Sequence, residues 1–137
     1  GAADNAAKDD TNSHICRVLC VDDHADTLKL YDFALRREGF ETSLAATADE
    51  ARSYFQNQAF DVFILDSVLG NSSGVSLCAE VRDCQPEAAI LVISGQVARQ
   101  DREKALAAGA DEFLPKPVAL DDLWSVARRL VDGKCSL

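Results

Sequence analysis

The sequence has 137 residues, 47% of them hydrophobic and 27% charged, which is typical of one globular domain with enough apolar material for a core. The formal net charge of −9 argues against non-specific binding to nucleic acid or to an anionic membrane, because both require clustered Lys and Arg side chains. No apolar run approaches the roughly 18 residues of a membrane span. We therefore expect a cytoplasmic protein with no membrane partner and no direct nucleic-acid partner.

The five cysteines are an odd number and form no Cys-x-x-Cys pair, which is typical of a reduced intracellular protein. Cys16 and Cys20 are expected to lie about 13 Å apart along a strand, too far for one metal ion. Three of the five are therefore interpreted as small core residues: Cys16, Cys20 and Cys78. Cys135 is expected to be exposed near the terminus. The two histidines of the chain are too few and too isolated to predict a zinc site.

The apolar residues form a pattern that predicts five strands alternating with five helices. The predicted strands are short apolar runs, at residues 15–21, 40–46, 61–66, 88–95 and 112–117. Each is followed by a segment with apolar residues at helical spacing, and these predicted helices cover residues 26–39, 47–58, 75–84, 98–110 and 120–133. Residues 1–14 are interpreted as a flexible N-terminal tail and residues 134–137 as a C-terminal tail, which leaves one domain at 15–133.

The strands are continuously apolar, which indicates a parallel sheet covered by helices on both faces. We therefore predict an α/β fold, a doubly wound five-stranded parallel sheet of the flavodoxin-like order 2-1-3-4-5. Pro115 has no N–H to donate to a neighbouring strand, which favours an edge position for the fifth strand and agrees with this order.

Polar groups follow four of the predicted strands. Asp22 and Asp23 end the first strand and Asp66 ends the third, while Ser94 and Lys116 end the fourth and fifth. Because ligands of such sheets bind at the carboxyl ends of the strands, these groups are expected to converge. Three carboxylates in one crevice need a counter-charge, which Mg²⁺ with its oxygen ligands would supply. The set suits phosphoryl transfer with a carboxylate as nucleophile.

These motifs resemble a response-regulator receiver domain of two-component signalling, of the kind found in chemotaxis receivers. The resemblance covers about residues 15–132, and four stretches carry it: VDD at 21–23, DVFILDSVL at 61–69, ILVISG at 90–95 and AGADEFLPKP at 108–117. It implies phosphorylation by a histidine kinase or a phosphotransfer protein, with Mg²⁺ as cofactor. It also implies an output domain or effector that responds to the phosphorylated state.

The resemblance implies a role for each matching residue. Asp66 corresponds to the phospho-acceptor of the family. Asp22 and Asp23 correspond to the acidic pair that binds the metal, which Asp66 and the backbone carbonyl of Val68 also contact. Lys116 corresponds to the lysine of the site, and the peptide bond between Lys116 and Pro117 is expected to be cis.

Two further positions concern the output of the domain. Ser94 corresponds to the Ser or Thr of the family whose hydroxyl moves toward the phosphoryl group. Phe113 falls at the family's aromatic switch position. The expected partner surface is the face formed by residues 98–110, 112–117 and 120–133, and we expect Trp124 to be partly exposed on it. The alternative for Phe113 is a permanently buried core ring.

Two other functions are compatible with the same fold. One is a phosphatase with an aspartyl nucleophile, but such enzymes carry a second Asp two residues after the nucleophile, where this chain has Val68. The other is a binding module that has lost phosphorylation, which the complete set of polar groups disfavours. We therefore do not expect an enzyme in the usual sense, only a domain that catalyses its own phosphorylation and dephosphorylation.

Overall fold

The computed structural model describes residues 14–95 and 99–137. Except for its last residue, the tail predicted at 1–14 lies outside the described residues, as does the first residue of the helix predicted at 98–110. None of the helices in the described ranges combines the length and hydrophobicity needed to span a bilayer.

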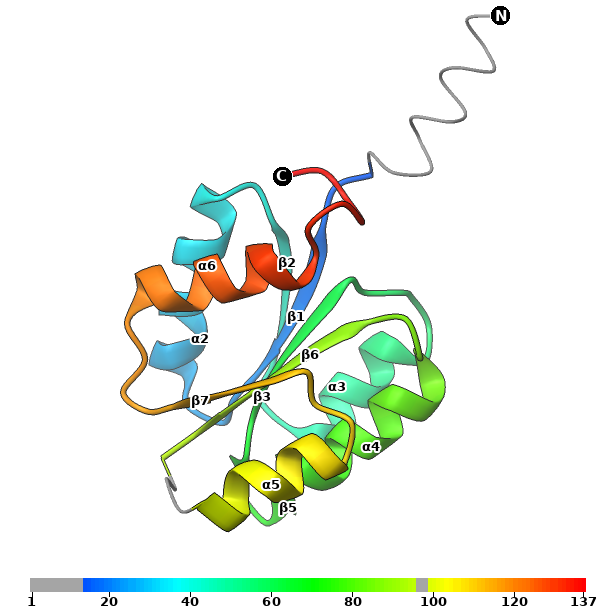
Figure 1. Cartoon of the computed structure of the whole chain (residues 1–137), viewed down its shortest axis with the longest axis vertical. Helices are drawn as coiled ribbons and strands as arrows, with labels where there is room; N and C mark the ends of the chain where they lie inside the picture. Colours follow the sequence, from blue (N-terminus) through cyan, green and yellow to red (C-terminus); the bar gives the residue numbers. More distant parts are fainter. Residues whose placement is uncertain (1–13, 96–98) are drawn as a thin grey trace, which may run out of the picture.

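Five parallel strands form the central sheet of the molecule (Figure 1). They are β1 (Arg17–Val21), β2 (Glu41–Ala45), β3 (Val62–Asp66), β6 (Ala89–Ser94) and β7 (Glu112–Pro115). Their spatial order is β2-β1-β3-β6-β7, which confirms the predicted doubly wound, flavodoxin-like fold. The edge strand β7 contains Pro115, as expected for a residue that cannot donate a backbone hydrogen bond.

The helices are α2 (Ala25–Arg37), α3 (Ala48–Phe55), α4 (Gly74–Cys84), α5 (Arg99–Ala107) and α6 (Leu120–Leu130). In Figure 1, α2 and α6 lie on one side of the sheet, and α3, α4 and α5 lie on the other. At the start of α3 the Thr47 side chain caps the helix by accepting a hydrogen bond from the Glu50 backbone N–H.

Two hydrophobic clusters, one on each face of the sheet, make up the core. Alternate strand residues such as Leu19, Phe63 and Val92 pack with α3, α4 and α5. Their neighbours in sequence, such as Val18 and Ile64, pack with α2 and α6. Both faces of each inner strand are therefore buried, which explains why these strands read as continuous apolar runs.

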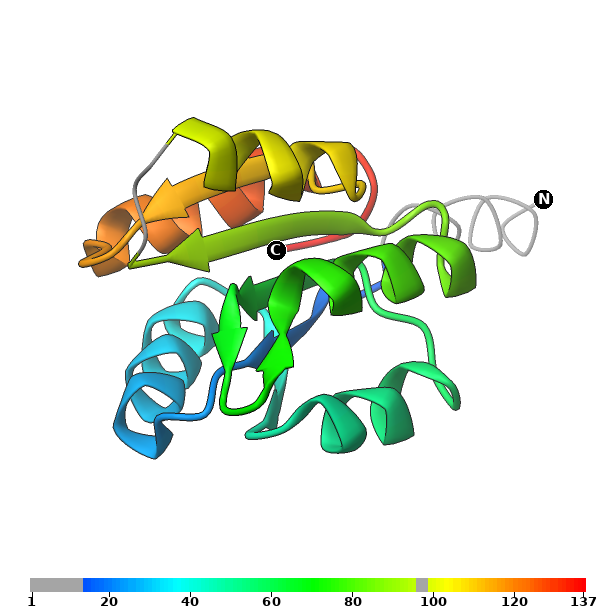
Figure 2. The same ribbon diagram turned by 90° about the horizontal axis from the view of Figure 1, so that it is seen from below.

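A short antiparallel hairpin, β4 (Val68–Leu69) and β5 (Ser72–Ser73), follows β3 and was not predicted (Figure 2). It lies in the loop that connects β3 to α4. Gly70 at its turn has a φ of 59°, a backbone conformation that glycine adopts without the strain other residues incur. The hairpin carries the chain from the end of β3 to the first turn of α4.

The prediction that all cysteines are free was wrong. Cys16, just before β1, forms a disulfide with Cys135, and their Cα atoms are 5.3 Å apart. Cys20 and Cys78 are buried free thiols, as predicted. The two bonded cysteines are separated by 119 residues, so only the return of the segment after α6 to the start of β1 reveals the pair.

Residues 134–137, predicted as a C-terminal tail, lie against the start of β1. The Ser136 backbone N–H donates to the His14 carbonyl at 2.8 Å, and the Cys16 N–H donates to the Ser136 carbonyl at 3.2 Å. Leu137 lies against Gly39, in the turn between α2 and β2. In Figure 1 the red C-terminal segment accordingly lies beside the blue start of β1.

Trp124 is half-buried, but it does not lie on the expected face formed by α5, β7 and α6. It lines a surface depression together with Phe33 and Arg37 of α2. The reason is helical spacing: Leu123 and Ala127 of α6 are fully buried in the core, and the next position around the helix from Leu123 is turned toward α2.

Candidate functional site

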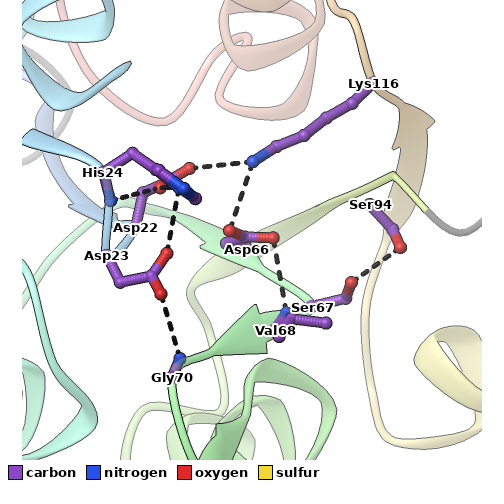
Figure 3. Close-up of polar contacts among 9 residues, drawn as sticks. All are labelled: Asp22, Asp23, His24, Asp66, Ser67, Val68, Gly70, Ser94 and Lys116. Atoms are coloured by element: carbon purple, nitrogen blue, oxygen red, sulfur yellow. Dashed lines mark hydrogen bonds and ion pairs between the residues drawn. The ribbon is translucent and has the colours of Figure 1, made fainter. Parts of the chain in front are cut away.

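The predicted polar groups do converge at one edge of the sheet (Figure 3). Asp22 directly follows β1, Asp66 is the last residue of β3, Ser94 is the last residue of β6 and Lys116 directly follows β7. Because β1, β3, β6 and β7 are neighbouring parallel strands, their carboxyl ends bring together residues that are far apart in sequence.

The Lys116 ammonium lies between two buried carboxylates. Its Nζ is 3.1 Å from Asp22 Oδ2 and 3.2 Å from Asp66 Oδ2. Asp22 is 1% exposed and Asp66 is 6% exposed, so both charges lie away from bulk water. Lys116 therefore supplies part of the counter-charge that the clustered carboxylates need. The peptide bond between Lys116 and Pro117 is cis.

The environment of Asp66 disfavours its charged form. Burial and the neighbouring charge of Asp22 raise the pKa of Asp66, and they outweigh the opposing effects of Lys116 and of the Val68 N–H. Burial by itself lowers the pKa of Lys116, but its hydrogen bond to Asp22 and the charges of both carboxylates outweigh burial and raise that pKa. Lys116 thus stays protonated beside a carboxylate that is costly to ionise.

Asp23 and His24 form the outer rim of the site. Asp23 Oδ2 accepts a hydrogen bond from the Gly70 N–H at 3.1 Å, which ties the β4–β5 hairpin to the end of β1. His24 Nδ1 lies 3.0 Å from Asp23 Oδ1 and 3.2 Å from Asp22 Oδ1, and its side chain is 70% exposed. His24 therefore contacts both members of the acidic pair.

The arrangement of these side chains fits a divalent cation. Asp22, Asp23, His24 and Asp66 each offer one ligand atom, and the four atoms lie within 4.8 Å of one another. The three carboxylates are the hard oxygen donors that Mg²⁺ prefers. A bound cation would also reduce the repulsion between the carboxylates, which is strong because they are shielded from water.

Val68 contacts Asp66 through its backbone. Its N–H donates to Asp66 Oδ1 at 3.3 Å, and its side chain is exposed. The predicted role of its carbonyl as a metal ligand stays a prediction.

Ser94 is fully buried and its hydroxyl accepts a hydrogen bond from the Ser67 hydroxyl at 2.6 Å. Ser67 was not singled out in the sequence. The register of the sheet explains the contact, because Asp66 pairs with Ile93 and the next residues of the two strands are therefore adjacent. Phe113 is buried in the core on the α3–α4–α5 side and pairs with Val92, while its role as a switch stays a prediction.

Gly74 is a second residue that the sequence did not single out. A Cβ atom placed on it would lie 1.8 Å from the backbone oxygen of Asp66, a distance that no real contact allows. The Gly74 N–H donates to the Ser67 carbonyl at 3.0 Å, and Ser73 caps the first turn of α4. The sequence feature that could have pointed to Gly74 is the Ser73-Gly74 pair at the start of a helix. There the glycine lets the helix approach the backbone of Asp66.

Comparison with known proteins adds independent information about this arrangement. A family model described as "Response regulator receiver domain" matches residues 18–128. The alginate biosynthesis transcriptional regulatory protein AlgB of Pseudomonas aeruginosa is 30% identical over 116 residues. This match covers 85% of the present chain but only 26% of AlgB, so the chain spans about a quarter of that relative.

Two solved structures resemble the chain over most of its length. A response regulator protein from Burkholderia pseudomallei, with a phosphorylated aspartic acid, calcium ion and citrate, shares 32% identity at a TM-score of 0.77. That match covers 84% of this chain and 66% of the other. A CheY-like receiver domain protein from Methanospirillum hungatei shares 28% identity at a TM-score of 0.81, with 87% and 96% coverage.

We predict that Gly74→Ala destabilises the domain by about 2–4 kcal/mol, because the new methyl group forces α4 away from the backbone of Asp66. Urea unfolding measures the effect. Gly95→Ala is the matched control, since nothing lies within 4 Å of a Cβ at Gly95. Equal stability of the two variants would contradict the proposed close approach of α4.

We also predict that Asp66→Asn raises the stability of the metal-free domain at neutral pH. The folded-state pKa of Asp66 is raised, so ionisation of Asp66 opposes folding above that pKa and has no effect below the unfolded-state pKa. The advantage of the variant should therefore shrink as the pH falls through the range in which Asp66 becomes protonated.

Thermal unfolding in the presence of a chelator, followed over a pH series, tests this prediction. Asp83→Asn, which removes an exposed carboxylate of α4, is the control and should change stability little. A metal-free wild type that is more stable than Asp66→Asn at neutral pH would refute the expected repulsion at Asp66.

Proposed function

Because this chain belongs to the response regulator receiver domain family, we propose that Asp66 accepts a phosphoryl group from a histidine kinase or a phosphotransfer protein. One observation carries the proposal. The buried Asp66 carboxylate ends the central strand β3, 3.2 Å from the ammonium of Lys116 and next to the acidic pair. Asp22 is also buried beside Lys116, but it belongs to the acidic pair after β1, whereas Asp66 ends the central strand.

The chemistry follows from the geometry. An oxygen of the Asp66 carboxylate attacks the phosphorus of the donor, the bond from phosphorus to the donor breaks, and an aspartyl phosphate forms. Lys116 lies close enough to neutralise charge on the transferred group. The buried position of Asp66 strengthens that electrostatic interaction, because few water molecules screen it.

We propose Mg²⁺ as the cofactor, held by Asp22, Asp23, Asp66 and the Val68 carbonyl. When bound, the cation neutralises the oxygens of the phosphoryl group and the repulsion among the carboxylates. The three carboxylates within ligand distance of one another support this proposal. In the fully assembled site the chain therefore provides the nucleophile, the metal ligands and a fixed ammonium.

We further propose that Ser94 transmits phosphorylation to the face formed by α5, β7 and α6. The Ser94 hydroxyl contacts Ser67 in the present structure. A new hydrogen bond from the Ser94 hydroxyl to a phosphoryl oxygen on Asp66 would stabilise the phosphorylated state by about 1.5–3 kcal/mol, as is usual for a hydrogen bond to a charged acceptor. A ligand shifts a conformational equilibrium only by its different affinity for the two states, and this bond supplies such a difference. Movement of Ser94 would let the ring of Phe113 repack beside β7.

AlgB is a transcriptional regulatory protein, and this chain matches only 26% of it. We propose that an output domain or effector reads the phosphorylated state, that the domain itself contacts no nucleic acid, and that it works in the cytoplasm. The Val68 side chain has no acid–base group, which disfavours a phosphatase with an aspartyl nucleophile.

Phosphorylation by acetyl phosphate tests the acceptor directly. In the presence of Mg²⁺ we expect intact-mass spectrometry to show one phosphoryl adduct on the wild type and on Asp83→Asn. Asp66→Asn should show none, because Asn keeps the shape of the side chain but removes the nucleophile. Phosphorylation of Asp66→Asn at the wild-type rate would rule out Asp66 as the acceptor.

Mg²⁺ should raise the melting temperature of the domain, because only the folded state brings the ligands together. Saturation to 100 times the dissociation constant corresponds to about 2.7 kcal/mol. Asp23→Asn should reduce this stabilisation, and Asp83→Asn should leave it intact. A melting temperature that responds equally to Mg²⁺ in all three proteins would argue against the proposed ligands.

NMR spectra with and without beryllofluoride, a mimic of the phosphoryl group, test the proposed transmission. We expect shifts at Phe113 and along α5 in the wild type, and smaller shifts in Ser94→Ala. Occupancy of Asp66 with unchanged Phe113 and α5 resonances would show that the ring is a permanent core residue. Equal shifts in both proteins would exclude Ser94 from the pathway.

A further inference from the structure

A second cluster of chemically active side chains lies at the opposite end of the sheet from Asp66. His14, Asp61 and Cys135 each offer a metal-ligand atom, and these three atoms lie within 4.8 Å of one another. The Cys135 sulfur is bonded to the sulfur of the buried Cys16, which lies outside this group. The cluster therefore holds one sulfur, one imidazole and one carboxylate, with a second sulfur bonded to the first. In sequence its members are scattered from residue 14 to residue 135, which is why neither the cysteine nor the histidine pattern predicted it.

Backbone contacts hold these residues in place independently of the disulfide. The Ser136 N–H donates to the His14 carbonyl, and the Ser136 carbonyl accepts from the Cys16 N–H. Backbone hydrogen bonds therefore join the two chain segments that carry Cys16 and Cys135. The Asp61 carboxylate accepts a hydrogen bond from the Arg17 N–H at 2.8 Å, and its other oxygen lies 2.9 Å from His14 Nε2. The loss of the S–S bond alone would therefore leave the Cys135 sulfur beside the imidazole and the carboxylate, and the Cys16 sulfur next to that of Cys135.

We propose that this cluster is a redox-controlled zinc site. In the oxidised state, the Cys16–Cys135 disulfide joins the start of β1 to the segment after α6. A dithiol reductant of the thioredoxin class transfers two electrons and two protons, which breaks the S–S bond and leaves two thiols while the reductant becomes a disulfide. Zn²⁺ then displaces the thiol protons and binds Cys16, Cys135, His14 and Asp61.

The ligand set favours zinc over the hard cations expected at Asp66. Thiolate and imidazole ligands select borderline and soft metals, whereas Mg²⁺ requires oxygen donors. Two thiolates on one tetrahedral zinc lie about 3.8 Å apart, from Zn–S bonds of about 2.3 Å. Cys16 and Cys135 have Cα atoms 5.3 Å apart, so their sulfurs can separate to this distance by side-chain rotation.

Access and local charge are compatible with a cation. His14 and Asp61 line an open surface cavity of about 320 Å³. Arg17 also lines this cavity, but its Nε lies 3.7 Å from the Glu41 carboxylate, which offsets its charge. The hydrogen bond from the Arg17 N–H to Asp61 orients that carboxylate, as is common around zinc ligands.

The oxidised state is tested first, by alkylation of the unfolded, unreduced protein and mass spectrometry. We expect three of the five cysteines to react, namely Cys20, Cys78 and Cys84. Cys135→Ser should show four reactive cysteines, because it frees Cys16. Five reactive thiols in the wild type after mild oxidation would overturn the disulfide.

Cobalt, used alone as a spectroscopic substitute for zinc, tests the reduced state. In the reduced wild type, one Co²⁺ per chain should show thiolate-to-cobalt charge-transfer absorption, and zinc should displace this cobalt. The disulfide form and Cys135→Ser should lose this absorption. His14→Gln should weaken cobalt binding at least tenfold while still forming the disulfide, which shows that the variant is folded.

Two controls separate this site from its surroundings. Cys84→Ser removes an exposed thiol outside the cluster and should leave the cobalt spectrum unchanged. Asp66→Asn should also leave it unchanged, because the carboxylate site contains no sulfur. Absence of charge-transfer absorption in the reduced wild type, or the same spectrum in Cys135→Ser, would overturn the zinc site.

Discussion

The ammonium of Lys116 holds two buried carboxylates together, and the rest of the site depends on this interaction. Asp22 and Asp66 are almost fully buried, and two like charges at that depth repel each other strongly. Lys116 lies within 3.2 Å of both and offsets part of that repulsion. Burial, and then the repulsion from Asp22 that remains, raise the pKa of Asp66. The acidic groups of the site therefore outnumber its one fixed positive charge, the Lys116 ammonium. This imbalance gives a physical reason for a divalent cation and for a cationic environment around a transferred phosphoryl group.

The packing around Asp66 is as restrictive as its electrostatics. The first turn of α4 approaches the backbone of Asp66 so closely that only glycine fits at Gly74. The β4–β5 hairpin spans the distance between them, and the hydrogen bond from Gly70 to Asp23 connects it to the acidic pair. On the other side of Asp66, Ser67 links the end of β3 to Ser94 at the end of β6. A change at Asp66 therefore reaches two neighbouring strands and one helix through direct contacts.

The two ends of the sheet have opposite chemical character. The carboxyl ends of the strands gather oxygen ligands and an ammonium, which suit a hard cation and phosphoryl chemistry. The amino ends, where His14, Cys16 and Asp61 lie near Cys135, gather sulfur and nitrogen. The rigid core between them consists of residues that are apolar on both faces of each inner strand. Such a core keeps the two ends at a constant separation, so each can carry its own chemistry.

The sequence by itself determined the fold class, the strand order and the residues at the carboxyl edge of the sheet. It could do so because parallel strands have local hydrophobic patterns and because their carboxyl ends share one edge by geometry. Only the tertiary structure decided the roles of Gly74 and Ser67 at the site and the location of the Trp124 side chain. Each of these depends on the distance or register between elements that are not adjacent in the chain. The Cys16–Cys135 pair is the clearest case. Its partners are separated by 119 residues, and no local pattern records that the segment after α6 returns to the start of β1.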